Sequence, residues 1–219
     1  MQLAIYDLDH TLIAGDSASL WLSYMVEIGW ASADLLKQEQ RLMNDYVLGK
    51  MAIDEYMQLC LKPMIGRHQA EVAQQVQDFI QQKISLLLYT DAVYELVRTE
   101  RAVCERLIIS ATADFLVKPI AQYLDVRHVL AINTELKEGC YTGRTVGTAT
   151  YQNGKVERLR ERLREWLAAG REFQSMRFYS DSCNDLPLLL QVEAPYPVNP
   201  DEKLLAYARE RNWPVLAWS

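Results

Sequence analysis

The stretch Leu3-Ala4-Ile5-Tyr6-Asp7-Leu8-Asp9-His10-Thr11 sets the fold of this chain. Its apolar run stops abruptly at Asp7 and Asp9, which predicts a buried strand that delivers two carboxylates to its carboxyl end. Residues two apart on an extended backbone point roughly the same way, so both side chains are expected to face one site. Taken alone, the segment also fits an acidic turn that ends a strand.

The sequence after this strand changes its pattern twice. Between about Ser17 and Leu88, apolar residues recur at helical spacing and β-branched runs are few, which predicts successive helices without a strand. Strands and helices then alternate. Strands are expected at 106–110, 128–132 and 176–180, with 194–198 and 215–218 able to close the sheet. Helices are expected at 91–101, 115–123, 156–169 and 185–191, and a hairpin or irregular loop at 141–150.

This order predicts an α/β fold with a doubly wound, mostly parallel sheet and a helical cap inserted after the first strand. We assign residues 1–14 and 89–219 to the catalytic core and residues 15–88 to the cap. The 219 residues are enough for one substantial core with a smaller appended unit.

Composition excludes several classes of protein. The net charge is −6 and no basic run occurs, which argues against a nucleic-acid surface. No stretch approaches the ~18 apolar residues of a membrane span, and no cleavable leader is evident, so a cytoplasmic protein is expected. The cysteines are scattered without a C-x-x-C pair, which predicts reduced thiols and not a zinc cluster or disulfide framework. The sequence leaves the oligomeric state open. The cysteines are Cys60, Cys104, Cys140 and Cys183.

The first acidic segment predicts phosphate chemistry that depends on a metal ion. A dianionic phosphate repels carboxylates, and a hard, oxygen-seeking Mg²⁺ makes their coexistence reasonable. Asp7 could then attack phosphorus, while Asp9 protonates the leaving oxygen and later deprotonates water. His10, between Asp9 and Thr11, either modulates this acid or is inessential.

Two further segments could bind the phosphate. Ser110-Ala111-Thr112 is expected where a strand ends and a helix opens, so its hydroxyls and N–H groups could cradle a phosphate, or Ser and Thr could simply cap that helix. Lys155 follows Gly154 at the start of an amphipathic helix. It could neutralise charge on phosphate oxygens, although surface lysines at helix starts are common.

The fourth segment is Tyr179-Ser180-Asp181-Ser182-Cys183-Asn184-Asp185. Asp181 would complete the magnesium shell, Asp185 would orient it, and Asn184 could donate to the phosphate. An ordinary turn before a helix is the alternative. All four segments are expected at the edge of the sheet where open α/β folds bind ligands, and this shared placement favours a single active site.

The four segments together resemble the motifs of the haloacid dehalogenase superfamily, and the helical insertion resembles the cap of its phosphoserine phosphatase-like subgroup. Asp9 marks the phosphatase branch. The resemblance implies that Asp7, the backbone carbonyl of Asp9, and Asp181 bind Mg²⁺, and we count Asp185 in the same metal set. It also implies that a small group of residues holds the phosphoryl group or substrate: Ser110, Lys155 and Asn184, to which we add Thr11, Ala111, Thr112 and Asp16.

The departures from this subgroup bear on the substrate. Asp16 replaces a Glu that meets the substrate amine in phosphoserine phosphatases, so an anion is retained. Counting from Gly49-Lys50, the position of their carboxylate-binding Arg falls near Cys60, and Lys62 would be a poor substitute. Ala111-Thr112 stands where those enzymes usually have two glycines. We therefore expect a phosphorylated amino alcohol or amino acid, such as histidinol phosphate or phosphoserine, and favour a substrate without a carboxylate.

Several alternatives remain at this level. A phosphotransferase or mutase would use the same aspartyl-phosphate. A non-catalytic phospho-aspartate switch is disfavoured because it would not need Asp9. In the cap, a set of apolar residues could form a wall over the site, but their helical spacing is more typical of simple core. These residues are Trp21, Tyr24, Val47 and Ile53.

Overall fold

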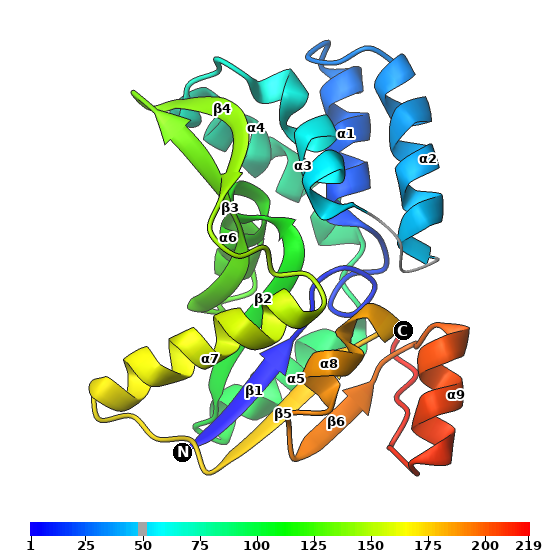
Figure 1. Ribbon diagram of the computed structural model, residues 1–219, viewed down its shortest axis with the longest axis vertical. Helices are drawn as coiled ribbons and strands as arrows, with labels where there is room; N and C mark the ends of the chain where they lie inside the picture. Colours follow the sequence, from blue (N-terminus) through cyan, green and yellow to red (C-terminus); the bar gives the residue numbers. More distant parts are fainter. Residues whose placement is uncertain (48–51) are drawn as a thin grey trace.

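The computed structural model describes the backbone of residues 1–47 and 52–219, with side chains for 1–43 and 52–219. In this part of the chain, six strands form one sheet in the order β4-β3-β2-β1-β5-β6 (Figure 1). Neighbouring strands run parallel, except that β4 is antiparallel to β3. The strands are β1 (Gln2–Tyr6), β2 (Glu105–Ala113), β3 (His128–Lys137), β4 (Cys140–Val146), β5 (Ser175–Ser180) and β6 (Ala194–Pro197).

The helices of the described residues fall into two groups. Those inserted between β1 and β2 are α1 (Ser17–Glu27), α2 (Asp34–Val47), α3 (Ile53–Leu61) and α4 (Gln69–Gln82), with the 3₁₀ turns η1 (Lys62–Met64) and η2 (Ile84–Leu86). Those around the sheet are α5 (Thr90–Arg101), α6 (Asp114–Tyr123), α7 (Asn153–Ala168), α8 (Leu186–Leu189) and α9 (Glu202–Glu210), with the 3₁₀ turn η3 (Cys183–Asp185). Figure 1 shows the inserted helices gathered beyond one end of the sheet.

The central strand β1 explains why the sequence opens with an unbroken apolar run. Its alternate residues belong to different hydrophobic clusters: Ala4 and Tyr6 to one, Leu3 and Ile5 to the other. A strand covered on both faces has no polar side to show in its sequence. The first cluster packs under α5 and α6, and the second under α7, α8 and α9, which makes the sheet doubly wound.

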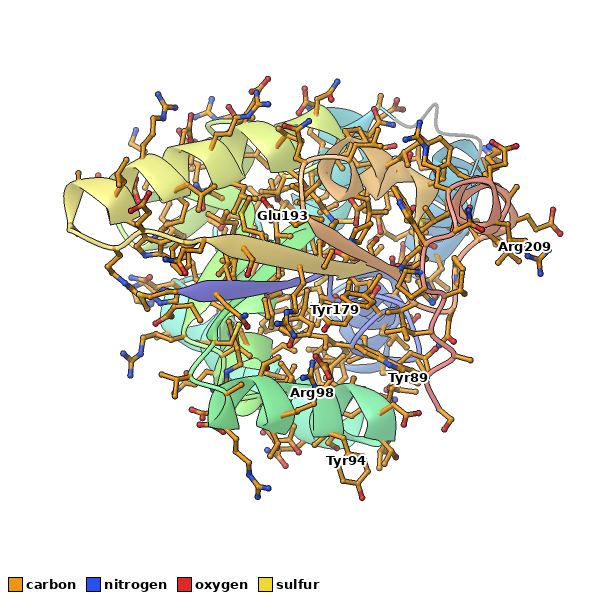
Figure 2. All side chains as sticks on the ribbon, turned by 90° about the horizontal axis from the view of Figure 1, so that it is seen from below. Tyr89, Tyr94, Arg98, Tyr179, Glu193 and Arg209 are labelled. Carbon is orange, nitrogen blue, oxygen red and sulfur yellow. The ribbon has the colours of Figure 1, made fainter. Side chains whose placement is uncertain are left out.

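The two covering layers are visible when the molecule is turned. In Figure 2, the yellow helix α7 and the green helix α5 lie on opposite sides of the sheet. Tyr179 points from β5 toward α5, where its hydroxyl donates to Glu95, and Arg98 also donates to Glu95. This contact ties α5 to the sheet beside the stacked rings of Tyr6 and Tyr179, whose centroids are 4.8 Å apart.

The predicted fold class is confirmed, and three details of the prediction are corrected. Strand β2 continues past 110 to Ala113, which pairs with Ile132 after a shift in register. Strand β3 continues to Lys137 because it pairs with β4, the hairpin arm expected at 141–150. Residues 215–218 add no strand; Leu216 makes only an isolated bridge to Val198.

The inserted segment contains helices, as predicted. Its buried side chains belong to the same hydrophobic cluster as Ala4 and Tyr6 of β1. Trp21 and Tyr24 are core residues, only 1% and 3% exposed. The backbone also links the insertion to the β3–β4 hairpin, through Gly66 N to Tyr141 O at 2.9 Å and Gln69 N to Gly139 O at 2.8 Å. The boundaries at 14/15 and 88/89 stay a prediction. No helix in the described ranges is long and apolar enough to cross a membrane.

Candidate active site

One cavity at the carboxyl end of β1, β2 and β5 collects residues from all four sequence segments. Parallel strands present their carboxyl ends at the same edge, which is why segments more than 100 residues apart meet here. Residues of the insertion cover the other side. The cavity is lined by Asp7, Asp9, His10, Asp16, Met43, Ile53, Tyr56, Ser110, Ala111, Thr112, Tyr151, Lys155, Asp181, Asn184 and Asp185.

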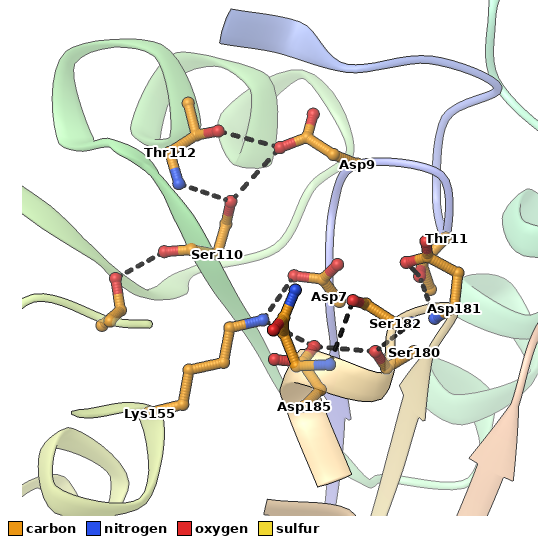
Figure 3. Close-up of polar contacts among 12 residues, drawn as sticks. Asp7, Asp9, Thr11, Ser110, Thr112, Lys155, Ser180, Asp181, Ser182 and Asp185 are labelled. Carbon is orange, nitrogen blue, oxygen red and sulfur yellow. Dashed lines mark hydrogen bonds and ion pairs between the residues drawn. The ribbon is translucent and has the colours of Figure 1, made fainter. Parts of the chain in front are cut away.

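Lys155 joins two carboxylates at the floor of the cavity. Its Nζ lies 2.8 Å from Asp7 Oδ1 and 2.7 Å from Asp185 Oδ2, and the residue is 3% exposed (Figure 3). Gly154 allows this placement, because a Cβ there would lie 1.9 Å from the carbonyl oxygen of Ala149. The start of α7 therefore packs tightly on the preceding loop and aims Lys155 at the end of β1.

Asp185 holds Lys155 in place. Its Oδ2 also accepts a hydrogen bond of 2.7 Å from Ser180 Oγ, and the residue is 2% exposed. This geometry matches the orienting part expected of Asp185. Its predicted membership in the metal set stays a prediction; its Oδ2 already accepts hydrogen bonds from Lys155 and Ser180.

Thr11 differs from its prediction as a phosphate- or substrate-binding residue. It is fully buried and does not line the cavity. Its Oγ1 donates to Asp181 Oδ1 at 3.0 Å and accepts from Asp181 N at 3.1 Å. Thr11 therefore helps to fix the orientation of the Asp181 carboxylate, because its buried hydroxyl both donates to Asp181 and accepts from it.

The Asp9 carboxylate points away from Asp7, toward the second segment and the insertion. Its Oδ2 accepts from Thr112 Oγ1 at 2.8 Å, and its Oδ1 accepts from Ser17 N at 2.7 Å. Figure 3 shows this carboxylate near Ser110, on the other side of the site from Asp181. The part of the Asp9 backbone carbonyl in metal binding, which the family resemblance implies, stays a prediction.

Burial raises the pKa of three acids that line the cavity, Asp7, Asp9 and Asp181. It raises the pKa of Asp7 to about 7, with Lys155 acting in the opposite direction and Asp185 adding repulsion. It raises the pKa of Asp9 to about 6, with repulsion from Asp16 as the next cause. It also raises the pKa of Asp181 well above its usual range, reinforced by Asp7. The acids are clustered and incompletely neutralised.

Burial disfavours the charged form of Lys155, but Asp185 and Asp7 outweigh this effect and raise the pKa of Lys155 above its ordinary value. Lys155 is thus held as a cation. One buried lysine faces Asp7 and Asp185, with Asp181 close enough to both to interact electrostatically. A divalent cation would supply the missing positive charge.

The oxygen donors at the site are compatible with part of the predicted Mg²⁺ set. Within the described ranges, no three His, Cys, Asp or Glu side chains already form a metal-binding group. In the set implied by the resemblance, two such side chains, Asp7 and Asp181, would hold the ion together with the backbone carbonyl of Asp9. Hard oxygen donors and retained waters are what Mg²⁺ prefers.

Ser110 and Thr112 lie inside β2, so the prediction that they open a helix is wrong; α6 starts at Asp114. The strand reaches further because its last residue still pairs with β3. Ser110 Oγ accepts from Thr112 N at 3.0 Å, and the carbonyl of Ser110 accepts from Thr150 Oγ1. Thr150 is a buried support that no sequence pattern had indicated.

Asn184 is oriented by a residue that the sequence did not single out. Gln152 Nε2 donates to Asn184 Oδ1 at 3.1 Å, from a backbone with a positive φ of 49°. Because Oδ1 is the acceptor in this contact, the amide NH₂ is the group that can donate to a phosphate. Tyr151 also contacts Asn184 Oδ1, at 3.4 Å, and lines the cavity.

The cap residues of the prediction separate into two sets. Asp16 and Ile53 line the cavity, whereas Lys62 is exposed and Cys60 is buried outside the lining. Gly49-Lys50 and the side chain of Val47 lie outside the described residues. Met43 and Tyr56 also reach the cavity, and helical periodicity alone could not distinguish them from core.

A protein-family model for haloacid dehalogenase-like hydrolases matches residues 4–190. The chain belongs to this family. This hydrolase is 33% identical over 216 residues to a histidinol-phosphatase of Neisseria meningitidis serogroup C, covering 98% of this chain and 97% of that protein. It is 28% identical over 226 residues to a phosphoserine phosphatase of Mycobacterium tuberculosis, covering 97% and 69%. Like these relatives, it is a phosphatase.

Solved structures agree with the fold. A protein of unknown function from Bordetella pertussis Tohama I superposes with a TM-score of 0.90 at 32% identity, covering 98% of this chain and 97% of that one. A substrate-bound phosphoserine phosphatase superposes with a TM-score of 0.70 at 15% identity, covering 98% and 91%. The second likeness concerns the fold alone.

Proposed function

We propose that this haloacid dehalogenase-like hydrolase is a Mg²⁺-dependent phosphatase that forms a phosphoryl-enzyme on Asp7. The observation that carries the proposal is the buried cluster in which Lys155 holds Asp7 while Asp181 lies close enough to repel it. A carboxylate at the end of the central strand, oriented by a fixed cation, is an activated nucleophile. Asp7, Asp181 and the carbonyl of Asp9 would hold Mg²⁺, which neutralises phosphate charge when bound.

The chain's own groups account for both half-reactions. An Asp7 oxygen attacks phosphorus, the bond from phosphorus to the ester oxygen breaks, and Asp9 gives its proton to that oxygen. Asp9 then takes a proton from water, which attacks the phosphoryl-aspartate and releases inorganic phosphate and the Asp7 carboxylate. The raised pKa of Asp9, about 6, suits a group that must both give and accept a proton near neutral pH.

Three donors support the phosphoryl group in this proposal. Lys155 Nζ lies beside Asp7 Oδ1, and Ser110 and Asn184 line the same cavity. Fixed donors of this kind stabilise the charge that develops on phosphorus-bound oxygens. The Thr112 hydroxyl instead holds Asp9, so we assign it to positioning the acid.

The organic part of the substrate is proposed from the cap side of the cavity. Asp16 supplies a carboxylate for an amine, and no arginine lines the described part of the cavity to receive a substrate carboxylate. The similarity to a histidinol-phosphatase over almost the whole chain supports the same choice. We therefore propose histidinol phosphate, or a closely related phosphorylated amino alcohol, in preference to phosphoserine.

The test is a steady-state assay of phosphate release with histidinol phosphate and with phosphoserine, with and without Mg²⁺, plus acid-quench trapping of labelled phosphoryl-enzyme. We expect Mg²⁺-dependent turnover and a trapped label that Asp7→Asn abolishes. Absence of label in an active wild-type enzyme would contradict the Asp7 intermediate. A tenfold higher kcat/KM for phosphoserine would contradict the substrate assignment, and a second phosphorylated product would indicate a phosphotransferase.

A further inference from the structure

The cap side of the cavity contains an acidic pair that the phosphoryl chemistry does not use. Asp16, the N-cap of α1, accepts from Ser19 N at 2.7 Å, and the hydroxyl of the same Ser19 donates to Glu39 Oε1. Glu39 belongs to α2 and is only 9% exposed. Ser19 therefore links two carboxylates from different helices at the edge of the substrate cavity.

In the described part of the chain, no lysine or arginine forms an ion pair with this acidic pair. Among the ion pairs of the described residues, none involves Asp16 or Glu39. His10 is close enough to favour the charged form of Asp16, while Glu39 opposes it. Burying carboxylates without a cation is costly unless hydrogen bonds or a bound partner compensate.

Tyr56 provides a second and independent sign that a ligand belongs here. It lines the cavity and is 4% exposed, and its hydroxyl has no hydrogen-bond partner among the described residues other than the Cys60 thiol. The Cys60 thiol lies near enough to influence the pKa of Tyr56, but a thiol is a weak partner. A buried hydroxyl with only a weak partner is unfavourable, and a stronger hydrogen-bonding group of a ligand in the cavity would lower that cost.

We propose that Asp16, Glu39 and Tyr56 form a subsite for an organic group that carries a protonated amine and a second N–H donor but no carboxylate. Carboxylates only accept hydrogen bonds, so the ligand must supply the donors, and a ligand carboxylate would be repelled. Asp16 and Tyr56 line the cavity and would touch this group. Glu39 lies behind Asp16 and acts as a positioning residue, through Ser19 and through its charge.

This inference rests on the proposed function and sharpens its substrate class. Histidinol phosphate carries an amine and an imidazole N–H without a carboxylate. Phosphoethanolamine carries the amine alone, phosphoserine adds a carboxylate, and p-nitrophenyl phosphate has no cationic group. The contribution of the second donor is therefore measured by comparing histidinol phosphate with phosphoethanolamine.

The test compares Glu39→Gln and Tyr56→Phe with the wild type on histidinol phosphate, phosphoethanolamine and p-nitrophenyl phosphate. Because Glu39→Gln removes one of the two negative charges near the bound amine, we expect KM for histidinol phosphate to rise by about tenfold. In Tyr56→Phe the rise should be about threefold to tenfold. In both, kcat should fall less than KM rises, and the preference over p-nitrophenyl phosphate should shrink.

Asp34→Asn is the matched control, because Asp34 also lies on α2 and loses one charge, but is exposed beside Lys37. Its substrate preference should stay within about twofold, the change expected of a surface ion pair. Equal losses on all substrates, or no change in KM, in Glu39→Gln and Tyr56→Phe would overturn the subsite. If the wild type hydrolysed none of the substrates, the proposed function itself would fail instead.

A binding measurement separates recognition from turnover. Histidinol has the amine and imidazole but no phosphate, so its competitive inhibition of p-nitrophenyl phosphate hydrolysis reports on this subsite alone. We expect its Ki to rise in both variants and to stay unchanged in Asp34→Asn. If Glu39→Gln lowers the urea midpoint, Tyr56→Phe carries the test, and an unchanged Ki there would reject the proposal.

Discussion

The ammonium group of Lys155 is the only cation of a described lysine or arginine side chain that forms an ion pair with the acids at the end of β1. Sequence order alone shows Lys155 148 residues from Asp7 and 30 from Asp185. The structure joins them because α7 starts beside the carboxyl ends of β1 and β5. Lys155 is therefore expected to contribute both to the folding stability of the protein and to its catalytic activity.

Replacing Lys155 by methionine should destabilise the protein by about 3–5 kcal/mol, because two buried carboxylates lose their partner. The loss should be larger at pH 8 than at pH 5.5. Burial raises the pKa of Asp7 to about 7 even with Lys155 opposing it, so the stability of the wild type falls as pH rises from the ordinary range of an aspartate toward that value. Without Lys155 the pKa of Asp7 rises further, and in the variant the fall continues to higher pH. Urea unfolding at both pH values measures this.

The control for Lys155→Met is Arg160→Met on the same helix, where the exposed guanidinium donates a hydrogen bond to the Gln191 amide oxygen. It should change the unfolding free energy by less than about 0.5 kcal/mol, as surface substitutions do. A loss that is equally small in Lys155→Met would mean that the buried acids do not depend on that cation.

Mg²⁺ binding that depends on Asp181 should be measurable as a rise in the thermal stability of the protein. A ligand at one hundred times its dissociation constant stabilises the folded state by about 2.7 kcal/mol, so Mg²⁺ should raise the Tm of the wild type. In Asp181→Asn, whose side chain Thr11 still holds, the rise should nearly vanish. Differential scanning calorimetry with Mg²⁺ titration decides it, and an unchanged rise in Asp181→Asn would remove Asp181 from the metal set.

At the level of elements, Asp201 connects a peripheral helix to the catalytic loop. It caps α9 through Leu204 N at 2.8 Å, and its other oxygen accepts from Cys183 N at 2.7 Å. Its own N–H donates to the carbonyl of Asp181 at 2.8 Å. The loop that carries Asp181 and Asn184 is therefore fixed from outside by the start of α9.

Asp201→Ala should cost about 1–2 kcal/mol of stability from the lost cap and also weaken Mg²⁺ affinity, because the loop loses an anchor. Isothermal titration with Mg²⁺ and urea unfolding measure the two effects. His68→Ala is the control, since His68 caps α4 far along the insertion by accepting from Ala70 N. His68→Ala should lower the stability without changing the Mg²⁺ affinity. If His68→Ala and Asp201→Ala changed the Mg²⁺ affinity equally, the anchoring role of Asp201 would be refuted.

Across the whole molecule, the insertion and one face of the sheet share a hydrophobic cluster. Phe79 of α4 and Trp21 of α1 belong to it together with Tyr6 and Ile108 of the sheet. The rings of Trp21 and Phe79 pack edge to face, with their centroids 5.3 Å apart. A shared core of this kind couples the unfolding of the insertion to that of the sheet.

Phe79→Ala should lower the free energy of unfolding by about 3–5 kcal/mol and keep a single transition. Tryptophan fluorescence, which reports on Trp21 and Trp30 among others, should coincide with far-UV circular dichroism during urea unfolding. The control is Leu86→Ala in the same insertion, where the side chain is 80% exposed. Two separated transitions in Phe79→Ala would show that the insertion unfolds independently.

The sequence predicted those site residues that directly follow an apolar strand, and it missed those that do not. Asp7, Asp9, Asp181 and Asn184 stand out because each follows an apolar strand, and strand ends converge in parallel sheets. Asp201, Thr150 and Gln152 carry no such signal, since they support the site from loops and helix starts whose positions depend on packing. The misplacement of Ser110 before a helix arose because pairing with β3 extends β2 beyond its apolar run.

By itself the sequence determined the fold class, the family and the acids of the site, because periodicity and motif spacing are local properties of the chain. Only the tertiary structure decided that Thr11 supports Asp181, that Asp9 turns toward Thr112, and that Glu39 and Tyr56 lie near Asp16. Those facts depend on how α1, α2 and α3 pack over the sheet. Packing depends on many weak contacts between segments that are far apart in the sequence, so it cannot be predicted from any short stretch of sequence.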